Sequence, residues 1–200
     1  MKVWDILKFG LVLMAYAAAA CVGLAFVYAG TAKTIEQREM DDQEAALKEL
    51  FPGAESFKEI TGAITSPDHR VSFESQWEVR QGDKIIGVAL QAVGGSYGGP
   101  IKILVGVNTG GTISRIKIME HSDTPGLGAN AGKKGYFVNK EKKLTFYGQF
   151  DGKPVSDPFK PGDDVVVITA ATITSQAVST AVKAAGTAAE QWLTEQGAGT

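Results

Sequence analysis

The sequence predicts an α+β protein, with a single N-terminal transmembrane helix followed by one mainly antiparallel α+β domain. Three observations predict this class. Residues 9–32 form a run of 24 residues without a charged side chain. The middle of the chain alternates β-branched segments with turns rich in Gly, Asn and Asp, as antiparallel strands do. From Ser175 to about Gln196 the sequence is rich in alanine and lacks proline, which predicts a helix.

The uncharged run is long enough to cross a membrane. At the helical rise of about 1.5 Å per residue, it spans a hydrocarbon core of about 30 Å. Two alternatives remain for this segment: a cleaved secretory signal, since alanine dominates residues 15–20, and a lipoprotein cleavage site at Ala18-Ala-Ala-Cys21. The run continues for eleven residues beyond Cys21, which favours an uncleaved anchor over both.

Charge and cysteine content exclude several classes of function. The span contains no Asp, Glu, His, Lys or Arg, so we expect it to anchor the protein rather than conduct ions. Basic residues flank both of its ends and therefore do not decide its orientation. Cys21 is the only cysteine, which excludes an intrachain disulfide and a thiolate metal cluster. With 20 basic against 22 acidic residues, the chain gives no reason to expect a nucleic-acid partner.

Turn signals divide the rest of the chain into short elements. Residues 33–50 predict an amphipathic helix that ends at Pro52 and Gly53. Four strands follow, and the last two form a β-hairpin around Asn108-Thr-Gly-Gly111. The expected strands are 72–80, 84–93, 101–107 and 112–120, with short strand-like pieces at 136–138 and 144–147. The expected domains are residues 1–32, the anchor, and residues 33–200, the domain that follows it.

The segment from Asp164 to Val178 is the first candidate for a functional site. Its β-branched start predicts a buried strand, and a hydroxyl-rich stretch then leads into the C-terminal helix. A helix N-terminus beside small residues offers unpaired N–H groups to an anion. The competing interpretation is an ordinary capped helix with Thr174 or Ser175 as its N-cap. Spacing alone favours the capped helix.

Two glycine-rich segments are weaker candidates. Residues 94–100 carry four glycines around Tyr97, and they can form a simple turn or bring the backbone close to a flat ligand. Residues 124–128 read Thr-Pro-Gly-Leu-Gly, which fits a turn with proline at its second position. Thr124 and Leu127 would also present a polar donor and an apolar surface to a ring system.

The sequence contains no recognisable hydrolytic or metal site. Its two histidines, His69 and His121, are far apart, and neither belongs to a zinc-binding spacing. No phosphate-binding loop with Lys-Ser/Thr and no dinucleotide fingerprint occurs. A proton-transfer pair of His121 and Asp123 has no support from spacing. We therefore expect no catalytic acid, base or nucleophile, and no metal ligand.

Four segments taken together resemble a known family. They are Leu50-Phe-Pro-Gly-Ala54, Tyr97-Gly-Gly-Pro-Ile-Lys102, Glu120-His-Ser-Asp-Thr-Pro-Gly-Leu-Gly128 and Thr169-Ala-Ala-Thr-Ile-Thr-Ser175. With the membrane helix before them, they closely resemble the G subunit of the Rnf complex, the ion-translocating ferredoxin:NAD⁺ oxidoreductase. They are less similar to the C subunit of the sodium-translocating NADH:quinone reductase. That relative usually has a longer soluble region than the 168 residues that follow Ala32 here.

The resemblance implies a covalent flavin. In the family, a separate flavin transferase esterifies the phosphate of FMN to a threonine of a Ser/Thr-Gly-Ala-Thr motif, and the matching residue is Thr172. Ala170 replaces the glycine of this motif. Val166 stands where the family has an aspartate, for which Asp164 could substitute from a shifted position. The expected FMN-binding residues are Thr172, Thr169, Ala171, Thr174, Ser175, Tyr97, Gly98, Asp123, Thr124, Gly126 and Leu127.

The function that the resemblance implies is electron transfer. FMN in this domain would relay electrons between other membrane subunits of an Rnf-type complex, whose large partners conduct Na⁺ or H⁺. The resemblance also implies a single-pass protein of the prokaryotic cell membrane, with the FMN domain on the periplasmic or extracellular side. A different class stays open, a membrane-anchored scaffold or binding protein without flavin, which Val166 and Ala170 suggest.

Overall fold

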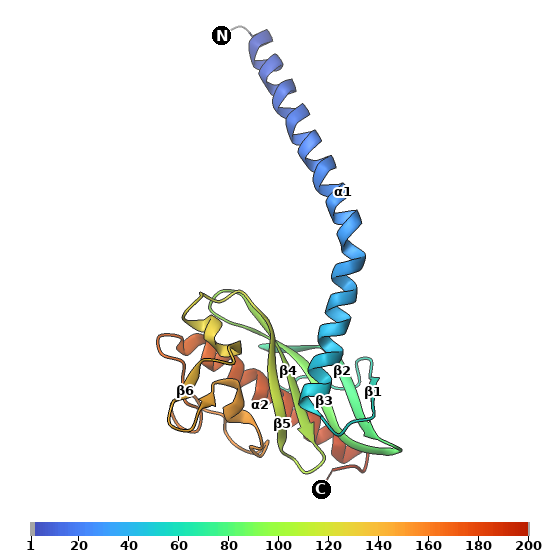
Figure 1. The fold of residues 1–200 in the computed structure, drawn as a ribbon, viewed down its shortest axis with the longest axis vertical. Coiled ribbons are helices and arrows are strands. Elements are labelled where there is room, and N and C mark those ends of the chain that lie inside the picture. The colour runs from blue at the N-terminus through green and yellow to red at the C-terminus, as the bar shows by residue number, and fades with distance from the viewer. Residues whose placement is uncertain (1–2, 200) are drawn as a thin grey trace. The chain divides into compact units, whose positions relative to one another are not determined.

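The computed structural model describes residues 3–199 and divides the chain into two units (Figure 1). The first unit, Met1–Glu44, is helical over its described residues, and the second, Ala45–Thr200, contains all of the β-strands described. Helix α1, Val3–Leu50, makes up the described part of the first unit and contributes its last residues to the second.

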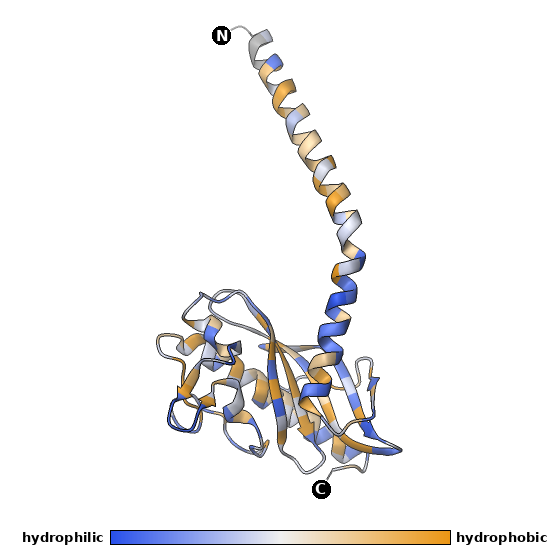
Figure 2. Cartoon of the chain, in the orientation of Figure 1, coloured by the Kyte–Doolittle hydropathy of each residue, from blue (hydrophilic) through white to orange (hydrophobic). Residues whose placement is uncertain are grey.

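Helix α1 is continuous over its whole length. Its Leu7–Leu50 stretch is the one helix among the described residues that is long and apolar enough to cross a membrane. Figure 2 shows apolar residues along its N-terminal half and a hydrophilic stretch after them. The amphipathic segment predicted at 33–50 is a continuation of this helix. The expected domain boundary after Ala32 falls inside the helix, and it stays a prediction.

The second unit is built on a five-stranded antiparallel sheet with the strand order β1-β2-β3-β4-β5. The strands are β1 Ser56–Glu59, β2 Val71–Gln81, β3 Lys84–Gly95, β4 Pro100–Asn108 and β5 Ile113–His121. Each strand pairs with the next along the chain, so the sheet is a meander of hairpins. The four predicted strands and the predicted β4–β5 hairpin are confirmed. The short edge strand β1 is an addition to the prediction.

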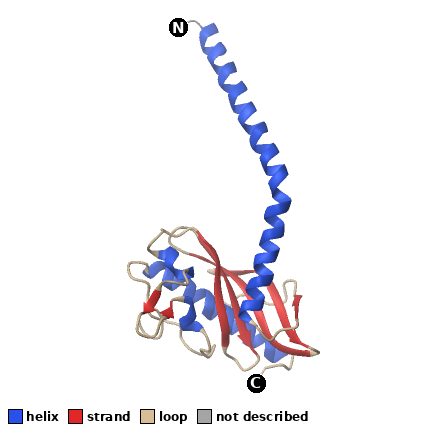
Figure 3. Cartoon of the chain, in the orientation of Figure 1, coloured by secondary structure: helices blue, strands red, loops and turns tan. Residues whose placement is uncertain are grey.

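Helix α2, Thr172–Glu195, covers one face of the sheet across β3 and β4 (Figure 3). Its buried alanines share one core with apolar side chains from these strands. Small side chains let a helix lie close to a sheet, and the carbonyl oxygen of Ala177 lies 3.9 Å from where a Cβ on Gly94 would be. The start of α2 therefore lies over the end of β3.

The opposite face of the sheet is covered by the end of α1. Leu47, Leu50 and Phe51 are buried there in a second core with side chains from β2, β3 and β4. The Phe51 ring needs two glycines beneath it, because a Cβ would lie 2.7 Å from it at Gly87 and 2.8 Å from it at Gly106. A helix on each face of an antiparallel sheet confirms the α+β class.

A compact region of short elements follows β5. It contains the 3₁₀ turn Gly128–Gly132, the small sheet of β6 Phe137–Asn139 and β7 Leu144–Thr145, and a second 3₁₀ turn, Tyr147–Phe150. The two predicted strand-like pieces are therefore confirmed, although the second ends earlier than expected. The ring centroid of Phe150 lies 5.9 Å from that of Phe146 and 5.8 Å from that of Phe159. These aromatic contacts stabilise the region.

The prediction of a buried strand at the start of the 164–178 segment is wrong. The Val166 N–H donates to the Gln149 side chain at 2.8 Å, and Gln149 Nε2 donates to the Val166 carbonyl at 3.1 Å. The Ile168 N–H donates to Ser175 Oγ at 3.0 Å. Side chains thus bond the backbone groups that a neighbouring strand would otherwise bond, so β-propensity does not produce a strand here.

Candidate functional site

A cavity of about 450 Å³ lies where three segments of the domain meet. These segments are the turn between β3 and β4, the loop after β5, and the start of α2. The lining residues are Tyr97, Asp123, Thr124, Leu127, Gly128, Ala170, Ala171, Thr172, Ile173 and Thr174. The meander and the helix across it therefore bring together three motifs that are far apart in the sequence.

The carboxylate of Asp123 joins the three segments. Its Oδ2 accepts hydrogen bonds from Ser96 Oγ at 2.6 Å and Thr174 Oγ at 2.9 Å, and its Oδ1 accepts one from the Gly98 N–H at 2.7 Å. Burial alone would raise the pKa of Asp123, but these hydrogen bonds and the nearby His121 outweigh burial and hold that pKa below its usual range. Asp123 is therefore a buried anion at neutral pH that fixes the loops around the cavity.

Two glycines allow the loops to come this close. A Cβ on Gly98 would lie 2.2 Å from the carbonyl oxygen of Ser122, and one on Gly128 would lie 2.4 Å from Thr174 Oγ and 2.8 Å from Asp123 Cβ. Any larger residue at either position would push the loops apart. Both glycines thus shape the cavity through close backbone approach.

The loop after β5 turns at Thr124-Pro-Gly-Leu127, and the predicted turn is confirmed. The Leu127 N–H donates to the Thr124 carbonyl at 3.1 Å, and Gly126 has the positive φ, +82°, that the third residue of a type II turn requires. The turn holds Leu127 at the rim of the cavity, where its side chain is 41% exposed. Tyr97, 72% exposed, and Ile173, 56% exposed, complete an apolar rim that suits an aromatic ligand.

Helix α2 begins at Thr172, earlier than predicted. Its N-cap is Ala171, which makes no side-chain capping bond, so the prediction of Thr174 or Ser175 as the N-cap is wrong. Thr174 Oγ donates to Asp123, and Ser175 Oγ donates to the Ala171 carbonyl at 3.0 Å. The buried contacts of these two hydroxyls override their local preference for capping.

The start of α2 presents free donors to the cavity. The first N–H groups of an α-helix have no acceptor within the helix, and no described residue accepts a hydrogen bond from the N–H groups of Thr172, Ile173 and Thr174. The Thr172 side chain is exposed, and its hydroxyl has no partner among residues 3–199. The chain enters the helix through Ala170, whose φ of +58° is left-handed.

Most of the predicted site residues lie together. Those that line the cavity are Tyr97, Asp123, Thr124, Leu127, Ala171, Thr172 and Thr174. Gly98 and Gly126 shape the loops without lining it, and Ser175 is buried beneath the helix start. Thr169 is exposed and does not line the cavity.

Three further residues belong to the site although they are not among the expected FMN-binding residues. Gly128 ends the Thr-Pro-Gly-Leu-Gly segment, and its position there was a visible signal. Ser96 precedes Tyr97, but its bond to Asp123 depends on a contact between distant segments. Ile173 is apolar, and only the structure shows that it is exposed at the cavity rather than buried in the core.

The carboxylate of Asp164 contacts residues close to it in the chain. It accepts hydrogen bonds from the N–H groups of Phe159 at 3.2 Å and Lys160 at 2.6 Å, and it pairs with Lys153 Nζ at 3.3 Å. Burial raises the pKa of Asp164, but these contacts outweigh burial and lower that pKa. The Val166 side chain, by contrast, is 48% exposed. Asp164 is thus held by its neighbours, whereas position 166 is open at the surface.

Comparison with known proteins identifies the family. The family model described as the RnfG N-terminal region matches residues 1–50, and that of the FMN-binding domain matches residues 96–187, which include the whole cavity. The chain is 30% identical to the G subunit of the ion-translocating oxidoreductase complex of Methanosarcina acetivorans, over 90% of this chain and 93% of the relative. The chain belongs to the G-subunit family of these complexes.

Other members of the G-subunit family carry more detailed names. The G subunit of the proton-translocating ferredoxin:NAD(+) oxidoreductase complex of Clostridium ljungdahlii is 32% identical, over 81% of this chain and 80% of the relative. That of the Na(+)-translocating ferredoxin:NAD(+) oxidoreductase complex of Acetobacterium woodii is 27% identical, over 90% of this chain and 89% of the relative. The resemblance to the Rnf G subunit is therefore confirmed, and the FMN-binding domain match supports FMN as the ligand of the domain.

Proposed function

We propose that this chain is the electron-transfer subunit of a membrane-bound, ion-translocating ferredoxin:NAD⁺ oxidoreductase, with FMN attached covalently to Thr172. The observation that carries the proposal is the exposed, unpartnered hydroxyl of Thr172 at the wall of a cavity in the FMN-binding domain. Membership of the G-subunit family supports the kind of complex in which the protein acts.

Among the hydroxyls of the helix-start motif, only that of Thr172 is both accessible and at the cavity. Thr174 is 1% exposed, and its hydroxyl bonds to Asp123. Ser175 is 0% exposed. Thr169 is exposed, but it does not line the cavity. An incoming phosphate could therefore reach Thr172 without breaking a buried hydrogen bond.

The surroundings of Thr172 suit a phosphate. The unpaired N–H groups of the first turn can donate to its oxygens, and the positive end of the helix dipole favours negative charge. Ala170 and Ala171 have side chains small enough to let a phosphate approach the backbone. Asp123 is the one acidic residue among the described residues that line the cavity, and its carboxylate already accepts three hydrogen bonds from the protein.

The remainder of the cavity suits the ring system of FMN. Tyr97, Leu127 and Ile173 offer apolar surface, and Thr124 offers a hydroxyl beside it. Bound FMN supplies the electron chemistry, while the protein positions it. A covalent bond would keep the flavin in this subunit through repeated redox cycles and limit its distance from neighbouring carriers.

Co-expression with a flavin transferase, the proposed maturation partner, tests the covalent bond. The protein band should fluoresce after denaturation in SDS, and its mass should increase by one FMN less one water. Thr172→Ala should abolish both signals, whereas Thr169→Ala is the matched control that should keep them. A dark wild-type band would support the scaffold without flavin instead, and fluorescence in Thr172→Ala would show that another residue carries the flavin.

The membrane helix suits an anchor, so the ion path is proposed to lie in partner subunits. Residues 9–32 carry no charged or histidine side chain that could relay an ion. Relatives with 32% and 27% identity are named for protons and for Na⁺ respectively, which agrees with ion choice being made outside this subunit. Reconstitution of the complex with this subunit exchanged between such relatives should leave the coupling ion unchanged.

We further propose that the FMN domain lies on the periplasmic or extracellular side. Cys21 is the only cysteine, so a Cys21→Ala background allows a single reporter thiol at the exposed hairpin position Asp83. A membrane-impermeant maleimide added to intact cells or spheroplasts should label Asp83→Cys. Labelling only after the membrane is broken would place the domain in the cytoplasm.

A further inference from the structure

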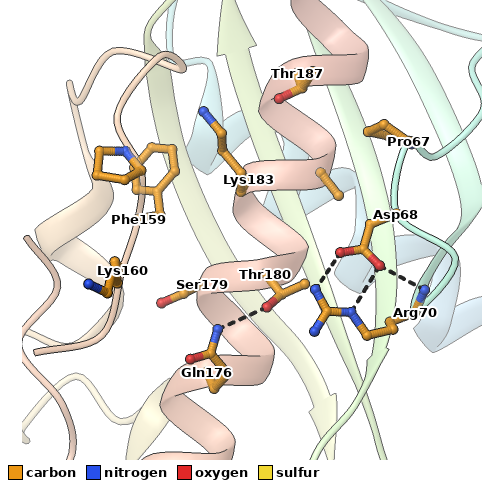
Figure 4. A pocket seen from close by; sticks show the side chains of 12 residues that line it. Pro67, Asp68, Arg70, Phe159, Lys160, Gln176, Ser179, Thr180, Lys183 and Thr187 are labelled. Atoms are coloured by element: carbon orange, nitrogen blue, oxygen red, sulfur yellow. Dashed lines mark hydrogen bonds and ion pairs between the residues drawn. The ribbon is translucent and has the colours of Figure 1, made fainter.

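A second cavity, of about 390 Å³, lies along α2 and shares no lining residue with the first. Figure 4 shows α2 between the segment that carries Asp68 and Arg70 and the loop that carries Phe159 and Lys160. On α2 the cavity begins at Gln176, beyond the residues that line the proposed flavin site. The proposed function leaves this second cavity without a role.

Cationic side chains outnumber carboxylates in the lining of this cavity. The cavity is lined by three cationic residues, Arg70, Lys160 and Lys183, and by one carboxylate, that of Asp68. Arg70 Nε and Nη2 donate to Asp68 at 3.0 and 2.6 Å, which fixes the guanidinium and leaves its Nη1 without a partner among residues 3–199. Lys160 Nζ pairs with Asp163 at 2.7 Å, but both side chains are mostly exposed, so this pair is weak.

The charge of Lys183 is not offset by any carboxylate among the described residues. Its Nζ donates to the backbone carbonyls of Val155 at 2.7 Å, Asp157 at 2.9 Å and Ser156 at 3.3 Å. These carbonyls use its N–H groups and hold the ammonium in place. A positive charge fixed beside a cavity attracts an anion through space, even when it donates no hydrogen bond to that anion.

Ser179 contributes a hydroxyl that lacks a partner. Its side chain lines the cavity and is 0% exposed, and its Oγ makes no hydrogen bond within the described chain. Figure 4 shows this hydroxyl projecting from α2 toward the loop that carries Lys160. Ser175, one turn earlier, uses its hydroxyl twice, with Ile168 and Ala171. A buried hydroxyl without a partner is costly, so a ligand oxygen at this position would satisfy it.

The wall opposite α2 is held in one shape. Phe159 has a φ of +47°, which is unusual for a bulky residue, and it is buried. Asp164 accepts hydrogen bonds from the N–H groups of Phe159 and Lys160 and so holds this conformation. On α2, Gln176 Nε2 donates to Thr180 Oγ at 3.2 Å, which leaves the hydrogen of the Thr180 hydroxyl for a ligand. The donors are therefore in place before a ligand binds.

We propose that this second cavity binds a phosphate group. The oxygens of a phosphate point toward the corners of a tetrahedron. Different oxygens can therefore accept hydrogen bonds from the Arg70 guanidinium and from the hydroxyls of Ser179 and Thr180. Lys160 and Lys183 add positive charge around them. The same chemistry is offered by inorganic phosphate and by the headgroup of an anionic phospholipid, and experiment can separate these two sources.

Calorimetry on the full chain in an uncharged detergent tests the first source, with inorganic phosphate as the titrant. Ser179→Ala should weaken binding by about tenfold or more, because it removes a hydrogen bond to a charged ligand. The same variant should have an equal or higher Tm in phosphate-free buffer, because it also removes an unsatisfied hydroxyl. Ser72→Ala, an exposed serine on β2, is the matched control and should change neither value. Phosphate bound elsewhere, such as at the start of α2, would bind equally to Ser179→Ala.

Lys160→Gln provides a second variant that leaves the buried core intact. It should weaken phosphate binding, whereas Lys58→Gln on β1, outside the cavity, should not.

The lipid source is tested by hydrogen exchange of the full chain in nanodiscs of phosphatidylglycerol and of phosphatidylcholine. Slower exchange of residues 176–187 in phosphatidylglycerol alone, lost in Ser179→Ala, would identify the headgroup as the ligand. Equal behaviour of wild type and Ser179→Ala in both experiments would overturn the proposal.

Discussion

Ala170 is the residue of the helix-start motif with a left-handed backbone. Its φ of +58° costs a residue with a Cβ about 1 kcal/mol, which glycine avoids. Ala170→Gly should therefore raise the free energy of unfolding by about 1 kcal/mol in a urea titration. Ala171→Gly is the matched control, because the φ of Ala171 is −137° and glycine gains nothing there. A less stable Ala170→Gly would show that the left-handed turn is not strained.

Asp123 is the residue on which the shape of the proposed flavin cavity most depends. Its removal leaves the buried donors of Ser96, Gly98 and Thr174 without their acceptor. Asp123→Ala should therefore lower the free energy of unfolding by about 3 kcal/mol, measured in urea. Asp123→Asn should lose less, because its amide keeps an acceptor and the two hydroxyls can turn to accept from its N–H groups. Equal losses in both variants would contradict the importance of the hydrogen bonds.

The lowered pKa of Asp123 also predicts how stability depends on pH. Its folded-state pKa lies below the unfolded value of about 3.9. The charged carboxylate therefore stabilises the fold above that value, and this contribution is lost as the pH falls through the folded-state pKa. Wild type should lose more stability than Asp123→Asn between pH of about 5 and about 3. Asp164, whose pKa is lowered as well, is present in both proteins and cancels in the comparison.

At the scale of elements, the cavity exists because the loop after β5 lies against the first turn of α2. Gly128 is the contact point, since a Cβ there would lie 2.4 Å from Thr174 Oγ. Gly128→Ala should therefore separate the two elements and lower the free energy of unfolding by about 2 kcal/mol. Gly135→Ala is the control, because nothing lies within 4 Å of a Cβ at that position. Similar urea midpoints for the two variants would show that the loop can move without cost.

Elements formed by local patterns were predicted from the sequence, and elements decided by distant contacts were not. The β4–β5 hairpin follows from alternating apolar residues around an Asn-Thr-Gly-Gly turn, and all of these are close in the chain. The run before α2 is equally rich in β-branched residues, yet Gln149 bonds Val166 and no strand forms. The prediction of the N-cap was wrong for the same reason, because the Thr174 hydroxyl donates to Asp123, which is distant in the sequence. Propensity is a local quantity, and a buried polar contact outweighs it.

At the scale of the whole molecule, the second unit has cores of its own on both faces of the sheet. Residues 41–200 should therefore fold without the apolar N-terminal part of α1 and unfold cooperatively in urea. A chain of residues 55–200 lacks Leu47, Leu50 and Phe51, which fill the second core. It should be less stable by about 5 kcal/mol, from the apolar surface that these three side chains bury. Equal stability of the two chains would mean that the end of α1 is not part of the domain.

The sequence by itself determined the long apolar N-terminal helix, the antiparallel sheet, the C-terminal helix and the family. These depend on run length, on periodicity and on motif order, which are all readable along the chain. Only the tertiary structure decided which residues of the motifs meet. It showed Thr172 free at the cavity, and Thr174 and Ser175 buried in bonds of their own. It also revealed the second cavity along α2, because Arg70, Lys160 and Ser179 come to line one cavity only when the chain folds. Sequence order carries local conformation, whereas the geometry of a site depends on contacts between distant residues.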